Sequence, residues 1–275
     1  MKKFWVFLLF SLPFCGLQTA FAQTETPPET EEMQTDRPSV GDAAKVVPQG
    51  AIQPEIGLKL ENDETNFYSD KEYLLPEVLL RYGLLDFLEL RLRGQLTHQV
   101  LDVSNPALPK RRFTDTGLNG LMLGTKIQLL KSAGARPDVA LQADFELPAG
   151  DETLKADKVQ PKLRLNFQNK LSKALSLNYN LGVEWEENIN PETGEAYNKF
   201  GLYTLALQYK VTETFQVFGE AFGELHQNDM QQSFDAGLAY KLRPNLQLDA
   251  YGGVGFSEEA PDYFVSAGVS FRLPK

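Results

Sequence analysis

Charged side chains recur at every second position in several stretches of this 275-residue chain. Glu89, Arg91 and Arg93 alternate with leucines, and Lys162 and Arg164 follow the same pattern. Side chains at alternate positions of a β-strand point to the same face of a sheet. Such a face could bind or guide a charged solute through non-covalent contacts. The spacing therefore predicts a wall lined with charges of both signs.

The charges that we select as candidates for setting selectivity all fall on the polar positions of alternating segments. The basic ones concentrate in the first half of the pattern and the acidic ones in the second half. If the sheet closes into a barrel, its lumen would have a basic side and an acidic side, which could impose a transverse field on a solute. Alternatively, the two sets of charges could pair across the lumen and close it. The basic candidates are Arg81, Arg91, Arg93, Lys126, Lys162 and Arg164, and the acidic candidates are Glu184, Glu220, Asp235 and Asp249.

Motifs for covalent chemistry are absent from the sequence. It has no phosphate-binding glycine loop, no paired-histidine zinc motif and no Gly-x-Ser-x-Gly. An outer-membrane lipase would need a serine, a histidine and an acid or amide partner, and no spacing around His98 or His226 singles out such a triad. We therefore expect no enzymatic activity, no cofactor and no metal. The net charge of −10 also argues against nucleic acid as a partner.

Twelve alternating segments between Ala51 and Phe271 would position these charges. Each runs for about nine to twelve residues, whereas soluble strands average about five or six and membrane-crossing strands about 9–11. Short connections such as Gly83–Asp86 alternate with long ones such as Glu61–Glu72 and His98–Thr116. The pattern predicts an all-β fold, a single antiparallel up-and-down transmembrane β-barrel of about 12 strands over residues 51–275, with both termini on the periplasmic side.

Aromatic residues at the strand ends are consistent with two membrane interfaces, because their rings are apolar with a polar edge. We assign Tyr82, Tyr209, Phe215, Tyr240 and Phe271 to the band beside the short turns, and Trp185, Tyr197, Phe256 and Tyr263 to the band beside the long loops. The alternative is a soluble barrel with its apolar face inward. Twelve strands enclose a lumen that apolar side chains would struggle to fill, which favours the membrane barrel. In the ninth segment, Phe218 and Phe222 fall on the otherwise polar face.

The first 50 residues divide into two parts. Residues 1–22 have the layout of a secretory signal peptide, with Lys2 and Lys3 before an apolar run and Ala20-Phe21-Ala22 as a cleavage site. Processing as a lipoprotein at Cys15 is the competing interpretation. Residues 23–50 are predicted to be a periplasmic N-terminal segment, with a disordered acidic leader and an ordered lead-in from Gln34 to Gly50. This segment is a candidate plug, and the sequence leaves an open and a plugged lumen as alternatives.

Three short motifs carry a family resemblance: Thr35-Asp36-Arg37-Pro38, Val47-Pro48-Gln49-Gly50, and the stretch from Leu80 to Asp86 followed by Leu88-Glu89-Leu90-Arg91. Together they resemble the family described as "MetA-pathway of phenol degradation" proteins, often labelled transporters. The resemblance implies an outer-membrane barrel that admits small organic molecules. The carboxyl end departs from what is common in such barrels, because Phe271 is followed by Arg272-Leu273-Pro274-Lys275 rather than ending the chain.

The sequence thus predicts an outer-membrane, porin-like channel for the passive passage of small solutes, exported through a cleaved signal peptide. The expected partners are outer-membrane lipid, the barrel-assembly machinery and a small solute that the sequence does not identify. The alternatives are a non-conducting structural or adhesion barrel and an outer-membrane lipid-modifying enzyme. Charge reversal at Arg91 is expected to alter ion preference. The acidic outer loops show no liganding spacing, so we interpret them as solvated rather than as sites for divalent cations.

Overall fold

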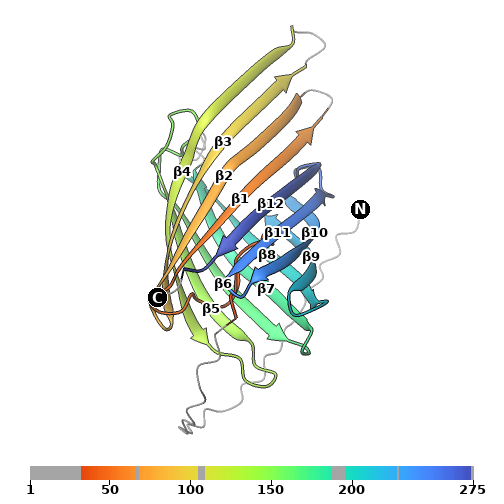
Figure 1. The fold of residues 1–275 in the computed structure, drawn as a ribbon. Coiled ribbons are helices and arrows are strands. Elements are labelled where there is room, and N and C mark those ends of the chain that lie inside the picture. Colours follow the sequence, from red (N-terminus) through yellow and green to blue (C-terminus); the bar gives the residue numbers. More distant parts are fainter. Residues whose placement is uncertain (1–31, 66–67, 105–108, 188–195, 228, 274–275) are drawn as a thin grey trace. The chain divides into compact units, whose positions relative to one another are not determined.

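A computed structural model describes residues 32–65, 68–104, 109–187, 196–227 and 229–273, so the predicted signal peptide and most of the predicted leader lie outside the described residues. The described chain folds into twelve strands (Figure 1). Their bounds are β1 Ile52–Glu64, β2 Tyr68–Leu85, β3 Leu88–Val103, β4 Arg111–Leu130, β5 Asp138–Leu147, β6 Gln160–Lys170, β7 Leu175–Glu187, β8 Tyr197–Lys210, β9 Phe215–Leu225, β10 Met230–Arg243, β11 Leu246–Gly255 and β12 Tyr263–Phe271.

The strands form one closed antiparallel barrel in which each strand pairs with its neighbours in the sequence. The seam is the pairing of β1 with β12, which runs from Glu55 opposite Ser270 to Asn62 opposite Tyr263. A further bond from the Leu273 amide to the Ile52 carbonyl, 2.8 Å long, extends this seam past the end of β12. The predicted fold class, an up-and-down barrel of twelve strands, is confirmed. No helix in the described ranges is long and apolar enough to span a membrane.

Alternation along the strands separates an apolar outer face from a polar interior. Leu90 and Leu92 of β3 are 44% and 41% exposed, whereas Glu89 and Arg91, which lie at alternate positions with them, are 0% and 4% exposed. The same contrast holds on the other strands, where the buried residues include many charged and amide side chains. The alternative of a soluble barrel with its apolar face inward is therefore wrong. An apolar outside and a polar inside are typical of membrane barrels.

The aromatic residues assigned to the interfaces lie at the strand ends with exposed rings or edges. Six are exposed and three are partly exposed, and their role as membrane anchors remains a prediction. The exposed ones are Tyr82, Tyr197, Tyr209, Tyr240, Phe256 and Tyr263, and the partly exposed ones are Trp185, Phe215 and Phe271.

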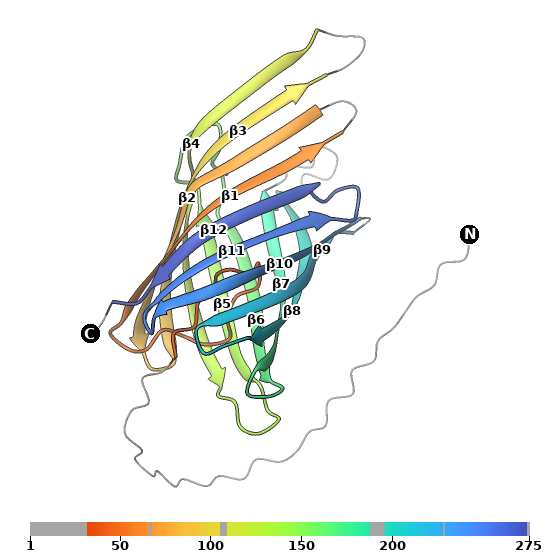
Figure 2. The ribbon, with the colours of Figure 1, turned by 45° about the vertical axis from the view of Figure 1, so that its right-hand side comes forward.

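Strands β2, β3 and β4 are longer than the sequence pattern indicates, with 18, 16 and 20 residues against 10 in β5 and 9 in β12. Most of the predicted loops Glu61–Glu72 and His98–Thr116 is strand, so that prediction was wrong. Backbone pairing continues there, for example between Val103 and Arg111, although the residues no longer alternate between apolar and polar. Figures 1 and 2 show the two hairpins of β1–β4 projecting past the neighbouring strands.

Candidate functional site

A stretch of irregular chain, Glu32–Gly50, lies inside the barrel, and we call it the inserted segment (Figure 2). Several of its backbone N–H groups donate to inward carboxylates of the wall, which replace the partners that a helix or sheet would give them. Glu55 Oε2 accepts from Asp36 and Arg37 at 2.9 and 3.1 Å. Glu220 accepts from Val40 and Gly41 at 2.8 and 3.0 Å.

Asp36 is the main ionic anchor of the inserted segment. Its carboxylate contacts Lys126 Nζ at 2.9 Å, Arg91 at 2.5 Å and Arg81 at 3.4 Å, on β4, β3 and β2. Its side chain is 5% exposed. Burial by itself raises the pKa of Asp36, but Arg81, Lys126 and Arg91 lower this pKa well below its ordinary value of 3.8. Asp36 is therefore ionised at neutral pH, and it neutralises part of a buried cationic cluster.

Arg37 anchors the segment to another part of the wall, β11 and β12. Its guanidinium donates to Asp249 Oδ1 at 2.9 Å and to Ser266 Oγ at 3.0 Å. The guanidinium lies against Gly57 of β1 and Gly268 of β12, which face each other across the barrel seam. A Cβ atom at either glycine would collide with the guanidinium. Glycine within a strand often marks the close approach of another group, and this pair forms a slot for Arg37.

Asp42 makes the third ionic contact. Its carboxylate binds Arg164 at 2.6 Å and Arg91 at 3.2 Å, and it accepts from Gln142 Nε2 at 3.0 Å. Burial raises the pKa of Asp42 and nearby Asp36 raises it further, yet Arg164 and Arg91 lower the pKa below its ordinary value. Asp36 and Asp42 together contact basic side chains on four strands, β2, β3, β4 and β6.

Both ends of the inserted segment are also held. At the start, Glu32 binds Lys210 at 2.8 Å and also contacts Lys241. Burial raises the pKa of Glu32, but hydrogen bonds from the two lysines lower this pKa to about 2. At the other end, Gly50 adopts a φ of 78° and its amide donates to the Gly83 carbonyl at 2.7 Å. A positive φ favours glycine, and this turn directs the chain from the lumen into β1.

The inserted segment separates two cavities in the lumen. The outer cavity has a volume of about 440 Å³ and lies on the side of the long hairpins, and the inner cavity has a volume of about 50 Å³. Arg37, Ser39 and Asp42 line both cavities. These three residues therefore lie where the two cavities adjoin.

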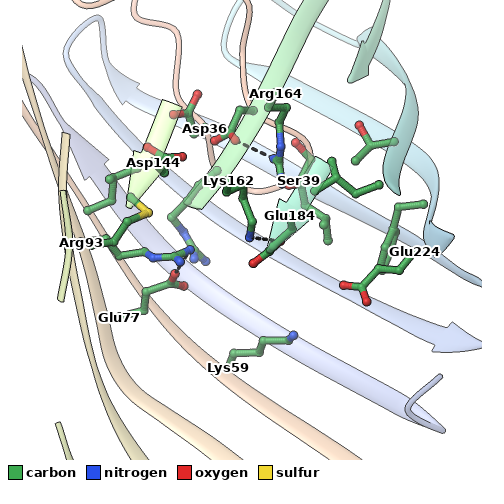
Figure 3. A pocket seen from close by; sticks show the side chains of 18 of the residues that line it. Asp36, Ser39, Lys59, Glu77, Arg93, Asp144, Lys162, Arg164, Glu184 and Glu224 are labelled. Carbon is green, nitrogen blue, oxygen red and sulfur yellow. Dashed lines mark hydrogen bonds and ion pairs between the residues drawn. The ribbon is translucent and has the colours of Figure 1, made fainter. Parts of the chain in front are cut away.

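Three ion pairs line the outer cavity with partly exposed side chains, and Figure 3 shows two of them, Lys162 with Glu184 and Arg93 with Glu77. Lys162 binds Glu184 at 2.6 Å, with the two side chains 23% and 18% exposed. The other pairs are Lys59 with Glu61 at 2.6 Å and Arg93 with Glu77 at 3.7 Å. These charges are more exposed than the anchors Arg37 and Asp42, which also line the cavity, so a solute in the outer cavity would meet mainly these pairs and Glu224.

The predicted site residues divide into three groups. Six of them contact the inserted segment: Arg81, Arg91, Lys126, Arg164, Glu220 and Asp249. Three line the outer cavity and pair with each other or with a wall carboxylate: Arg93, Lys162 and Glu184. The tenth, Asp235 of β10, is fully buried, and neither of its carboxylate oxygens has a hydrogen-bond partner in the described part of the chain.

The two sets of charges are bridged mainly by the inserted segment, which is part of the stretch predicted as a candidate plug. The basic residues of β2–β6 bind Asp36 and Asp42, and the acidic residues Glu220 and Asp249 bind the backbone and Arg37 of the same segment. Sequence reasoning missed Asp36, Arg37 and Asp42 as lumen residues. One available signal was the pair of inward glycines in the first and last strands, which indicates a close approach from inside.

Neither histidine is part of a catalytic arrangement among the described residues. His98 Nδ1 lies 2.6 Å from Thr116 Oγ1, and His226 contacts Glu224 at 3.1 Å and stacks on Phe200. Neither shows a serine contact there, so the geometry does not assemble the lipase triad considered above. Within the described residues, no group of three or more His, Cys, Asp and Glu side chains could hold a metal ion.

Solved structures with the same fold are outer-membrane barrels of different functions. An outer membrane channel from Pseudomonas putida F1 has a TM-score of 0.64 and 14% identity, covering 90% of this chain and 100% of its own. The NanC porin has a TM-score of 0.51 and 9% identity, covering 81% and 100%. The translocator domain of the autotransporter NalP from Neisseria meningitidis has a TM-score of 0.52 and 10% identity, covering 81% and 88%. At these identities the likeness shows the fold alone.

A family model extends the comparison to the sequence. No curated protein matches the chain. The model described as "Putative MetA-pathway of phenol degradation" matches residues 35–273. The match begins within the inserted segment and ends beyond β12, so it includes both the barrel and most of the chain inside it. The protein thus belongs to the "Putative MetA-pathway of phenol degradation" family.

Proposed function

We propose that this protein is an outer-membrane channel for the passive passage of small polar solutes, in which the inserted segment forms the constriction. The observation that carries the proposal is the division of the lumen. A charged outer cavity of about 440 Å³ and a smaller inner cavity of about 50 Å³ meet at Arg37, Ser39 and Asp42. On this proposal, a solute that crosses the barrel passes these three residues.

Two features support a passage rather than a solid core. The interior is lined by charged and amide side chains, which water and polar solutes solvate easily. The inserted segment is irregular chain rather than a strand of the sheet, so the closed barrel does not depend on it for a strand-to-strand contact. The expected setting is the outer membrane, reached through a cleaved signal peptide and inserted by the barrel-assembly machinery. We propose no enzymatic role.

A non-conducting barrel is the second candidate, because one observation favours it. The inserted segment is bound on several sides through Asp36, Arg37 and Asp42, and such a network of buried pairs could close the lumen completely. The two candidates predict opposite results in the same experiment.

The test is the electrical conductance of the purified mature protein in a planar lipid bilayer, after a heat-modifiable gel shift has shown that the barrel is folded. The proposal predicts discrete current steps in potassium chloride. It also predicts larger steps for a variant in which residues 32–48 are deleted and the turn at Gly50 is kept. A folded full-length protein that never conducts, beside a deletion variant that does, would establish a closed barrel instead.

A further inference from the structure

The outer cavity has two unlike walls. Three aromatic side chains point inward from the strands β9, β11 and β12: Phe222, Tyr251 and Phe264. Phe222 and Phe264 lie 5.9 Å apart between ring centroids in an edge-to-face arrangement, and Tyr251 and Phe264 lie 6.1 Å apart. A passage for small ions alone needs no such aromatic wall, and Phe222 is one of the two residues that break the polar pattern of its strand.

Basic side chains from β3 and β6 reach the same cavity. In a ring of twelve strands, β3 lies opposite β9, and β6 lies opposite β12. Arg93 of β3 and Lys162 of β6 therefore face the wall that carries Phe222 and Phe264. Figure 3 shows Arg93 and Lys162 among the side chains that line the cavity.

Arg93 has the largest unused capacity to donate hydrogen bonds in this cavity. Its guanidinium is 3.7 Å from Glu77 Oε1, which is too long for a hydrogen bond, and no hydrogen bond to it exists within the described part of the chain. A guanidinium carries five N–H donors in a planar fork that matches a carboxylate. Its side chain is 32% exposed to the cavity, so a solute can reach it.

Most carboxylates of the cavity, in contrast, already have a partner, whereas Glu77 has, among the described residues, only its 3.7 Å contact with Arg93. Glu61 binds Lys59, Glu184 binds Lys162 and Glu224 contacts His226. Asp36 and Asp42 are bound by the buried cations described above. The lining holds more acidic than basic residues. Of the three partly exposed ion pairs in the cavity, Arg93 with Glu77 is the longest, so Arg93 keeps the most unused donors. An incoming anion would compete with Glu77 alone for Arg93.

We infer that the outer cavity is a binding site for small aromatic carboxylates. The carboxylate binds Arg93, with Lys162 beside it, and the ring packs on Phe222 and Tyr251. The volume of about 440 Å³ lies within the range of about 300–1,000 Å³ that is usual for small-molecule sites. This inference rests on the proposed function, since it names the class of solute that the channel would hold before the constriction.

The experiment measures binding separately from conduction. Isothermal titration of the full mature protein in detergent uses benzoate, cyclohexanecarboxylate, benzyl alcohol and benzylamine as probes. The inference predicts that benzoate binds more tightly than the other three. Arg93→Gln should weaken benzoate binding by about tenfold or more, because a hydrogen-bonded charged partner is lost. Phe222→Leu should reduce the preference for benzoate over cyclohexanecarboxylate.

The matched control is Arg112→Gln, because Arg112 pairs with Asp102 on the projecting hairpin and its side chain is 68% exposed, away from the cavity. It should bind benzoate like the unmodified protein. Equal binding of benzoate and benzyl alcohol, or benzoate binding that Arg93→Gln leaves unchanged, would overturn the inference. Current steps in potassium chloride with no benzoate binding would overturn the inference and leave the channel intact. Benzoate binding in a barrel that never conducts would refute the channel and leave the binding site standing.

Discussion

Gly57 on β1 and Gly268 on β12 lie directly opposite each other across the seam that closes the barrel, and the guanidinium of Arg37 fills the space above both. Because neither glycine has a side chain, the inner face of β1 and β12 has room for Arg37 at this point. This places an anchor of the inserted segment and the closure of the barrel at one position.

Filling the slot should loosen the inserted segment. In Gly268→Ala, the new methyl group would collide with the Arg37 guanidinium, so we expect the Arg37–Asp249 contact to break and the single-channel current to rise or become noisier. The measurement is bilayer conductance. Gly201→Ala is the matched control, because a methyl group there meets Leu225 at an ordinary contact distance of 3.6 Å. Identical currents from the two variants would show that the slot does not hold the segment.

Removal of the Asp36 carboxylate should destabilise the barrel. Asp36→Ala leaves Arg81, Arg91 and Lys126 with fewer partners in a buried site, and breaking a buried ion pair costs about 3–5 kcal/mol. The free energy of unfolding in urea, followed by the gel shift, measures the loss. Asp102→Asn, which removes an exposed partner of Arg112, should leave the unfolding midpoint unchanged. A midpoint for Asp36→Ala equal to that of the unmodified protein would contradict the assigned role.

The anchor should also resist acid. The pKa of Asp36 lies well below 3.8 in the folded protein. Its stabilising contribution is therefore complete above pH 3.8 and is lost only as the pH falls through the lowered value. Carbon-13 NMR of the aspartate carboxyl groups in detergent should show one resonance, absent in Asp36→Asn, that has not titrated at pH 3.8. A midpoint for this resonance at or above 3.8 would refute the ion-paired arrangement.

We expect a charge other than Arg91, the one first suggested by the sequence, to set the ion preference. Arg91 is 4% exposed and pairs with Asp36, Asp42 and Glu89, so its reversal would disturb the fold rather than report on a solute path. We predict instead that Lys162→Glu shifts the reversal potential toward cations. Lys199→Glu is the control, because Lys199 lies over the ring of Trp185, a residue assigned to the lipid-facing aromatic band rather than to the lumen. A shift of equal size in both variants would point to a general surface effect.

Much of the barrel could be predicted from the sequence because a membrane barrel imposes a period of two. Leu90 and Leu92 against Glu89 and Arg91 show this directly. The extension of β2–β4 could not be predicted, because the hairpins project beyond the rest of the barrel and their strands no longer need an apolar face. The contacts of the inserted segment were also out of reach. Arg37 and Asp249 are 212 positions apart, and only the closed barrel brings them together.

The candidate site was predicted in part. The alternating charges identified the inner wall, but their partners depend on Asp36, Arg37 and Asp42, which lie in a segment without periodicity. Phe222 looked like an irregularity in a polar face, and its meaning required the neighbouring rings of β11 and β12. The period of two shows which face of the sheet a residue lies on. Its contacts also depend on the register of neighbouring strands and on the inserted segment, and neither can be deduced from the period.

Ser39→Cys tests the central claim most directly. Ser39 lines both cavities, and the sequence has only Cys15, within the expected signal peptide, so the new thiol would be unique in the mature chain. Bilayer current is recorded while a charged thiosulfonate reagent is added, with Ser172→Cys on an exposed turn as the control. A constriction formed by the inserted segment predicts stepwise, irreversible loss of current in Ser39→Cys and none in the control. A current that persists after complete modification of Ser39→Cys would contradict it.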